Sequence, residues 1–440
     1  MKLNNHEFVN KLLRKFNSHS YGRVELISIA VFFMPIFFLT VKSWVTTSLF
    51  LLFFVCCWPV IKNPTHYFCS RGKEFWILLV CLIMPFLSEL FAQIGRGEIT
   101  GSSLDGPSRM ILAAGIFVFL SSSNSVKIIQ SLSYGSALGT ISVFVSLIFF
   151  PNYYYGARAA TYFVDPITLP CFVIALLGLT LFWSRKVFPG YIDLFVKVLL
   201  AFVTIYIVVE SQSRSAFVAL VCLLTAYLTY FFRHSLKIQI IGLVGLITGF
   251  TILYFMSGIV HHRVNESVYG VLAFLSQDVY GVQQTSSGHR IVLGLIDVYL
   301  IKISPFFGVG DRSSLPPYEE LSLVIPYLSR LIYDIRVLAG SHSEFLALLV
   351  RQGLFFGSLT LCSLFFYPLY LFIWKYRKLT FVTGSPLAVV LGIVIPISAS
   401  SLTIQVFNLK MTITFYAACL AIFFAYLCSH VERKSVDDPL

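Results

Sequence analysis

Four residues of this sequence have the types and surroundings to do chemistry together. Arg158, Arg214 and Arg290 each lie among small or polar residues at the edge of an apolar segment. The planar fork of a guanidinium can bind a phosphate or pyrophosphate through two parallel hydrogen bonds. His342 begins another apolar segment, and a neutral imidazole can take a proton from a hydroxyl group near neutral pH. These residue types predict a site where the arginines bind a phosphorylated molecule and the histidine acts on the hydroxyl group of a second molecule.

Membrane-spanning helices are the elements that must hold these residues in place. Hydrophobic residues make up 57% of the 440-residue chain and charged residues only 12%, and the mean hydropathy is +0.83. A soluble domain needs more charge to cover its surface. We therefore expect an all-α polytopic membrane protein.

Hydropathy predicts about 12 transmembrane helices, each near the length of about 20 residues that a bilayer requires. The first span follows a polar N-terminal stretch without a small-residue cleavage pattern, so we do not expect a cleavable signal. The fourth predicted span is short and the tenth is long. The expected spans are 24–41, 43–61, 75–94, 109–121, 126–150, 164–183, 191–209, 212–232, 236–256, 343–374, 386–406 and 411–428.

The distribution of Lys and Arg orients these spans. Most basic residues fall in the loops on the side of the two termini, and few fall in the short loops on the other side. By the positive-inside rule, both termini are then cytoplasmic. The net charge of +12 is explained by this topology, and we expect no nucleic acid among the partners.

The long segment 257–341 then faces outward, into the periplasm if the host is a Gram-negative bacterium. We expect helices at 290–303 and 320–338 within it, from their apolar residues at helical spacing. The nine cysteines all lie outside it, and no spacing suggests a metal site. The expected organisation is therefore nine spans in 1–256, the periplasmic loop at 257–341, three spans in 342–430 and a cytoplasmic tail at 431–440.

Each candidate residue also has a structural explanation. An arginine at a helix end, such as Arg158, can extend to lipid phosphates, and Arg290 can be a solvated residue at a helix start. The tight serine-rich turn around Arg214 leaves less room for this. His342 can be a helix cap or an interfacial histidine. The predicted location of all four on the outer side favours a common site.

Several motifs in this order resemble the O-antigen ligase and polymerase superfamily of bacterial inner membranes. The resemblance covers most of the chain in topology, but its motifs are confined to about 150–170 and 210–355. They are Arg158-Ala-Ala-Thr-Tyr-Phe-Val-Asp165-Pro166, Ser213-Arg214-Ser-Ala, Ser287-Gly-His-Arg290, Ser304-Pro-Phe-Phe-Gly-Val-Gly310, and His342-Ser-Glu-Phe-Leu followed by Gly353.

The resemblance implies a GT-C-like membrane fold and a metal-independent glycosyltransferase without cofactor. Its donor would be a glycan linked to undecaprenyl pyrophosphate, used at the periplasmic face of the inner membrane. Arg214 and Arg290, with Arg158, would bind the donor pyrophosphate, and His342 would activate or position the acceptor hydroxyl. Ser343 stands where many members carry Asn, which puts any role of that amide in doubt.

The acceptor is less well defined by the sequence. The single large outer loop favours an O-antigen ligase, which uses a lipid A–core sugar hydroxyl in lipopolysaccharide biosynthesis. A repeat-unit polymerase with the same donor is the alternative. A lipid-linked glycan transporter or flippase is a third reading, for which Glu89, Glu210 and Arg351 would be intramembrane charges. The chain shows no internal repeat and has a long outer loop, and both features count against a transporter.

Overall fold

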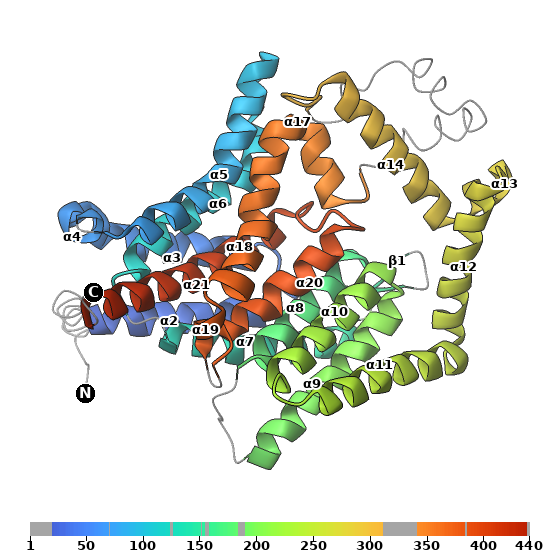
Figure 1. Cartoon of the computed structure of the whole chain (residues 1–440), viewed down its shortest axis with the longest axis horizontal. Helices are drawn as coiled ribbons and strands as arrows, with labels where there is room; N and C mark the ends of the chain where they lie inside the picture. The colour runs from blue at the N-terminus through green and yellow to red at the C-terminus, as the bar shows by residue number, and fades with distance from the viewer. Residues whose placement is uncertain are drawn as a thin grey trace, which may run out of the picture.

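The computed structural model describes residues 20–69, 71–123, 126–150, 152–154, 158–183, 190–310, 341–382 and 385–437. These residues are almost all helical (Figure 1). The strands in the described part of the chain are β1 (Asn152–Tyr154) and β2 (Arg158–Ala160), which form an antiparallel hairpin. The predicted class, an all-α polytopic membrane protein, is confirmed.

Nine helical runs in the described residues are long and apolar enough to cross a bilayer. The tenth predicted span is one of them, the run Glu344–Lys375. It consists of α17 (Glu344–Leu361), the π-turns η3 (Cys362–Phe366) and η4 (Leu371–Lys375), and α18 (Tyr367–Tyr370) between them. The other eight runs are the long helices α3 (Trp44–Lys62), α5 (Lys73–Arg96), α6 (Gly101–Leu120), α7 (Val126–Phe149), α9 (Gly190–Ser211), α10 (Arg214–Phe231), α11 (Leu236–Met256) and α21 (Lys410–Asp437).

The other three predicted spans are shorter helices. They are α2 (Ser20–Ile36), α8 (Thr168–Leu181), and the run formed by η5 (Pro386–Val390) and α20 (Leu391–Ser401). All 14 residues of α8 are buried, and Gly178 of α8 and Gly392 of α20 are so close that a Cβ on either would meet the other's backbone. Small residues at a helix crossing permit this close approach. These two helices are therefore short because they lie inside the bundle.

The fourth predicted span, 109–121, was too short. Helix α6 begins at Gly101, and the polar residues of its first turns are accommodated within the helix. Arg109 is buried and forms an ion pair of 2.7 Å with Asp105, one turn earlier. Hydropathy excluded this turn because it scores each charge separately and cannot detect such a pair.

The segment that follows α11 is a set of helices packed on the bundle. They are α12 (Gly258–Leu275), α13 (Val279–Gln284) and α14 (Ser286–Ile303). Helix α14 confirms the helix predicted at 290–303, although it begins earlier, and α12 and α13 were not predicted. The helix predicted at 320–338 lies outside the described residues.

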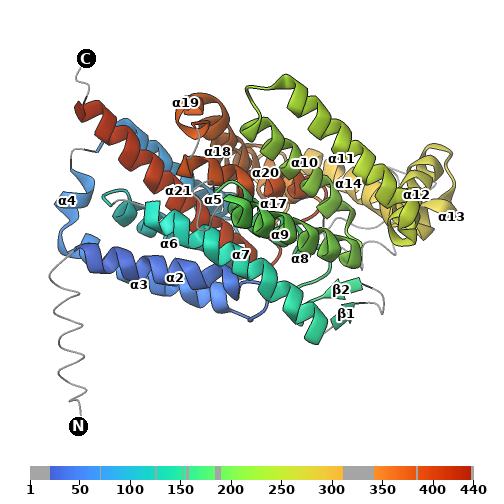
Figure 2. The same cartoon turned by 90° about the horizontal axis from the view of Figure 1, so that it is seen from below.

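The two ends of the bundle differ in what they carry. The start of α2 and the end of α21 lie at one end, and α12, α13 and the β1–β2 hairpin lie at the opposite end (Figure 2). Helix α14 packs against α12, α13 and α17 around a small apolar core that includes Val292, Ile296 and Val350. This arrangement brings the hairpin, the start of α10 and the start of α14 into one region. Two short helices, α4 (Pro64–Phe68) and α19 (Arg377–Thr380), complete the described elements.

Candidate active site

Arg214 joins three helices at the end of the bundle that carries α12–α14. It is the first residue of α10, directly after the N-cap residue Ser213. Its Nη2 lies 2.6 Å from Oε2 of Glu266 in α12, and its Nη1 donates a hydrogen bond to Oγ of Ser287 in α14. The guanidinium is therefore held in a fixed orientation and faces protein groups, which argues against a side chain that extends to lipid.

Glu266 is the acidic residue around which this site is built. It also accepts a hydrogen bond of 2.9 Å from Nη1 of Arg263, whose Nη2 donates to Oε1 of Gln212 at 2.8 Å. Burial acts to raise the pKa of Glu266, but the hydrogen bonds and charges of Arg214 and Arg263 outweigh it and lower the pKa. Glu266 is therefore ionised at neutral pH and fixes both arginines.

Arg290 contributes a positive charge that is only partly compensated. Its Nε is buried and has no hydrogen-bond partner among the described residues. Burial lowers the pKa of Arg290, and the positive charge of Arg214 lowers it further, while Glu266 acts in the opposite direction. A buried cation without a partner is costly, so this guanidinium is suited to an anionic ligand.

Arg158 lies close enough to Arg214, Arg263 and Arg290 for their charges to affect its pKa. Its Nε donates a hydrogen bond of 3.0 Å to the carbonyl of Ser211 at the end of α9. Burial, first, and then the charge of Arg263 lower its pKa to about 10, with smaller contributions from Arg290 and Arg214 in the same direction. Asp165 acts in the opposite direction.

Arg158, Arg214, Arg263 and Arg290 therefore form one arginine cluster. Two carboxylates act on it, and Asp165 also caps the start of α8 by accepting hydrogen bonds of 2.9 Å from the amides of Ile167 and Thr168. Among the described residues, four guanidiniums against two carboxylates leave an excess of positive charge, which favours an anion.

Close packing of α12 on α14 holds the cluster together. A Cβ on Gly270 of α12 would lie 2.6 Å from Oγ1 of Thr285 and 3.1 Å from the amide nitrogen of Gly288. Thr285 is the N-cap residue of α14 and accepts a hydrogen bond of 3.2 Å from Gly288. The absence of a side chain at Gly270 thus lets the start of α14 approach α12, where Ser287 reaches Arg214.

His342 lies just before α17 and is half-buried. The helix is capped by the next residue, Ser343, whose Oγ accepts from the amide of Leu346 at 3.4 Å and donates to the carbonyl of Ser401 at 3.3 Å. Serine and asparagine are both favoured N-caps, so Ser343 can preserve this function in place of asparagine. Because Ser343 caps α17, a capping role does not account for a histidine at position 342.

A backbone break in α17 fixes this helix relative to α14. Gly353 has φ 78°, and the turn after α14 docks at the break, with Val309 N donating to Val350 O at 2.9 Å and Leu354 N donating to Pro305 O at 2.6 Å. Arg96 of α5 donates to the freed carbonyl of Arg351 at 2.7 Å. Because the turn joins α14 directly to α17, it sets the position of Arg290 relative to His342.

Sequence reasoning identified three members of the cluster and missed Arg263 and Glu266. Their side chains meet at the i,i+3 spacing of a helix, a pattern that the sequence does show. The segment was taken as loop, so the spacing was not used. In the described residues, no group of three His, Cys, Asp or Glu could hold a metal ion. The described positive charges at this site belong to arginine side chains.

Comparison with known proteins agrees with these motifs. Residues 199–362 match the family model described as O-antigen ligase, a span that includes Arg214, Arg290 and His342. No curated protein matches the chain. The family is glycosyltransferase-like and its members are associated with the membrane. The match agrees with the resemblance carried by the motifs: residues 199–362 are an O-antigen ligase domain, which supports the O-antigen ligase superfamily for a multi-pass membrane protein.

Proposed function

We propose that this protein is an O-antigen ligase of the bacterial inner membrane. It would transfer a glycan from undecaprenyl pyrophosphate to a sugar hydroxyl of the lipid A–core at the periplasmic face, with both termini in the cytoplasm. The observation that carries the proposal is the arginine cluster, whose excess positive charge suits a pyrophosphate. Arg214, Arg263 and Arg290 of this cluster lie inside the matched residues 199–362.

In the proposed reaction, Arg214 and Arg290 bind the donor pyrophosphate, and Arg158 adds positive charge nearby. The acceptor oxygen attacks the anomeric carbon of the glycan as the bond from that carbon to the pyrophosphate oxygen breaks. His342 takes the proton of the acceptor hydroxyl. Undecaprenyl pyrophosphate leaves with its bonding electron pair, and the guanidiniums stabilise the negative charge that develops on it. Arginines thereby supply the charge stabilisation that a divalent cation gives in other transferases.

Glu266 has a positioning role in this proposal. A free Arg214 side chain has many rotamers, and ordering it on the donor costs conformational entropy. The ion pair with Glu266 and the hydrogen bond to Ser287 hold the guanidinium before the donor binds. Preorganised charge of this kind is what stabilises a transition state most effectively.

A deletion strain complemented with the wild-type gene tests the function. Lipopolysaccharide is separated on gels, and the chain length of the lipid-linked glycan is measured in parallel. A ligase deletion leaves bare lipid A–core while long undecaprenyl-linked polymer accumulates. Core capped with one repeat unit would instead identify a polymerase.

Transfer by the purified protein separates both enzymes from a transporter, because a flippase moves the donor lipid without forming product. A transporter could use the ion pair of Arg351 with the buried Glu89, but its two members lie 2.8 Å apart, and Glu89 also accepts a hydrogen bond from Gln352. An unchanged lipopolysaccharide ladder in a strain without a redundant enzyme would contradict the proposal.

A further inference from the structure

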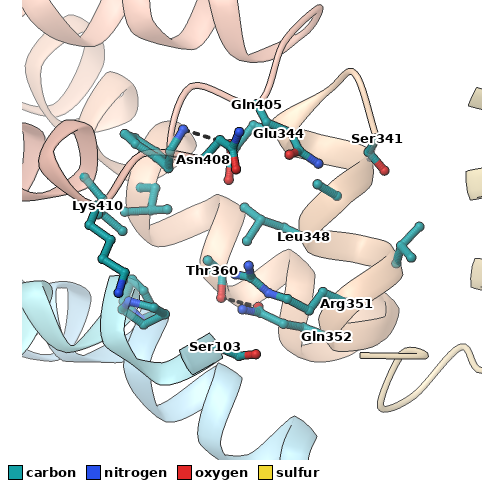
Figure 3. Close-up of a pocket in the computed structure, with 18 of the residues that line it drawn as sticks. Ser103, Ser341, Glu344, Leu348, Arg351, Gln352, Thr360, Gln405, Asn408 and Lys410 are labelled. Atoms are coloured by element: carbon teal, nitrogen blue, oxygen red, sulfur yellow. Dashed lines mark hydrogen bonds between the residues drawn. The ribbon is translucent and has the colours of Figure 1, made fainter. Parts of the chain in front are cut away.

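A second polar site lies apart from the arginine cluster. It is a cavity of about 380 Å³ between α5, α6, α17 and the connection from α20 to α21 (Figure 3). No member of the arginine cluster lines it. Its volume is within the range of small-molecule pockets, about 300–1,000 Å³. The function proposed above gives this cavity no role.

The cavity lies beside the two described residues that flank the segment 311–340. Gly310 and Ser341, the described residues that flank the segment 311–340, both line it. So do Glu344 and Lys410, the first residues of α17 and α21. His342 therefore lies between two residues that line the cavity, Ser341 and Glu344.

The charges at the cavity are internally compensated. Lys410 forms an ion pair of 2.5 Å with Asp105, which also pairs with Arg109, and Arg351 forms one of 2.8 Å with the buried Glu89. Glu344 adds a buried carboxylate to the wall. A phosphate would meet this carboxylate without an excess of positive charge. A neutral ligand therefore fits the cavity better than an anionic one.

Amides and hydroxyls provide the remaining polar groups. The side chains of Gln405 and Asn408 line the cavity, and neither has a hydrogen-bond partner within the described part of the chain. An amide can both donate and accept, as a sugar hydroxyl does. Ser103 adds a hydroxyl from the facing helix, and the apolar part of the wall includes Phe407. The cavity wall therefore combines amide and hydroxyl groups with apolar side chains.

We propose that this cavity binds a neutral saccharide unit of the acceptor, with Gln405 and Asn408 as specificity-determining residues. The proposal rests on the function inferred above and adds a place for the second substrate. The donor pyrophosphate occupies the arginine cluster, the acceptor sugar occupies the amide-lined cavity, and His342 lies beside the cavity at the start of α17. The two substrates then bind separate sites that differ in charge.

Substitution of the two amides tests the proposal. Gln405→Ala and Asn408→Ala are compared with Gln239→Ala, which removes an amide at the start of α11, outside the cavity. Transfer is measured on purified protein in nanodiscs, with lipid A–core and lipid-linked glycan from the host strain varied in turn. Each cavity variant should raise the KM for lipid A–core roughly fivefold, the effect of one lost hydrogen bond, and leave the KM for the donor unchanged. The control should change neither constant.

Binding gives a readout that does not depend on transfer. Delipidated core oligosaccharide is titrated calorimetrically into the wild type and into the double variant Gln405→Ala/Asn408→Ala. Ala347→Leu, which narrows the cavity without removing a polar group, should also weaken binding. Unchanged acceptor KM and oligosaccharide affinity in an active protein would overturn the saccharide site and leave the ligase function standing. A wild type that binds oligosaccharide but transfers nothing would overturn the ligase function instead.

Discussion

Arg290 offers the sharpest test of how the donor is bound. The side chain is half-buried, its buried Nε lacks a partner among the described residues, and the positive charge of Arg214 lowers its pKa. A bidentate contact to pyrophosphate would supply two charge-assisted hydrogen bonds, each contributing about 1.5–3 kcal/mol. Arg290→Lys keeps the charge and at most one bond.

The expected magnitudes follow from these contacts. Loss of one charge-assisted bond in Arg290→Lys should lower kcat/KM for the donor by a factor on the order of 10–100. Arg290→Ala removes both bonds and the charge, and loss of a preorganised donor at a developing anion costs on the order of 10²–10³ in kcat. Lys302→Ala, at the exposed end of the same helix, is the matched control and should retain wild-type activity.

Activity measured over a pH series shows whether Arg290→Lys fails because it loses the positive charge or because it loses the bidentate geometry of the guanidinium. Burial lowers the pKa of Arg290, and a lysine has a lower starting pKa than arginine. If Arg290→Lys failed because the lysine lost its proton, activity would recover as the pH is lowered, since acid restores the charged form. We expect the deficit relative to wild type to persist between pH 6 and 8, with transfer measured at saturating acceptor. Full activity of Arg290→Lys at any pH would refute the bidentate argument.

Three further predictions follow from the site and its supports. His342→Ala should abolish transfer in a discontinuous product assay while protein yield stays at the wild-type level. Ser343→Asn should unfold at the wild-type temperature and Ser343→Ala should be less stable by about 1 kcal/mol, measured by thermal unfolding, because only the first keeps a cap. Glu266→Gln should lower transfer about tenfold by releasing Arg214 from its ion pair, with monodisperse elution of the purified protein in size-exclusion chromatography as the control for folding.

The sequence predicted some helices of this protein accurately and missed others. Long apolar segments such as α9 and α11 were predicted almost to their ends, because hydropathy alone decides that they lie in lipid. Helix α12 was missed, because its first turns contain His261, His262 and Arg263, which hydropathy assigns to a loop. Its buried side is made of small residues such as Gly270 and Ala273, which give little periodic signal.

The candidate site was predictable in part for a similar reason. The positive-inside rule made arginines on the outer side conspicuous, so Arg158, Arg214 and Arg290 could be singled out one by one. Their proximity depends on contacts between α10, α12 and α14 that no local pattern encodes, such as the ion pair of Arg214 with Glu266. The roles of these arginines and of His342 in transfer stay predictions until variants are measured.

The docked turn at Gly353 has a consequence for how such proteins can diversify. The turn holds the end of α14 on α17, and residues 310 and 341 meet the same cavity. The segment between them is thus an insertion between two anchored points. For such a segment, doubling its length costs only about 0.6 kcal/mol in closure entropy. New sequence could therefore be grafted there to suit a different glycan, while Arg290 and His342 keep their positions on an unchanged scaffold.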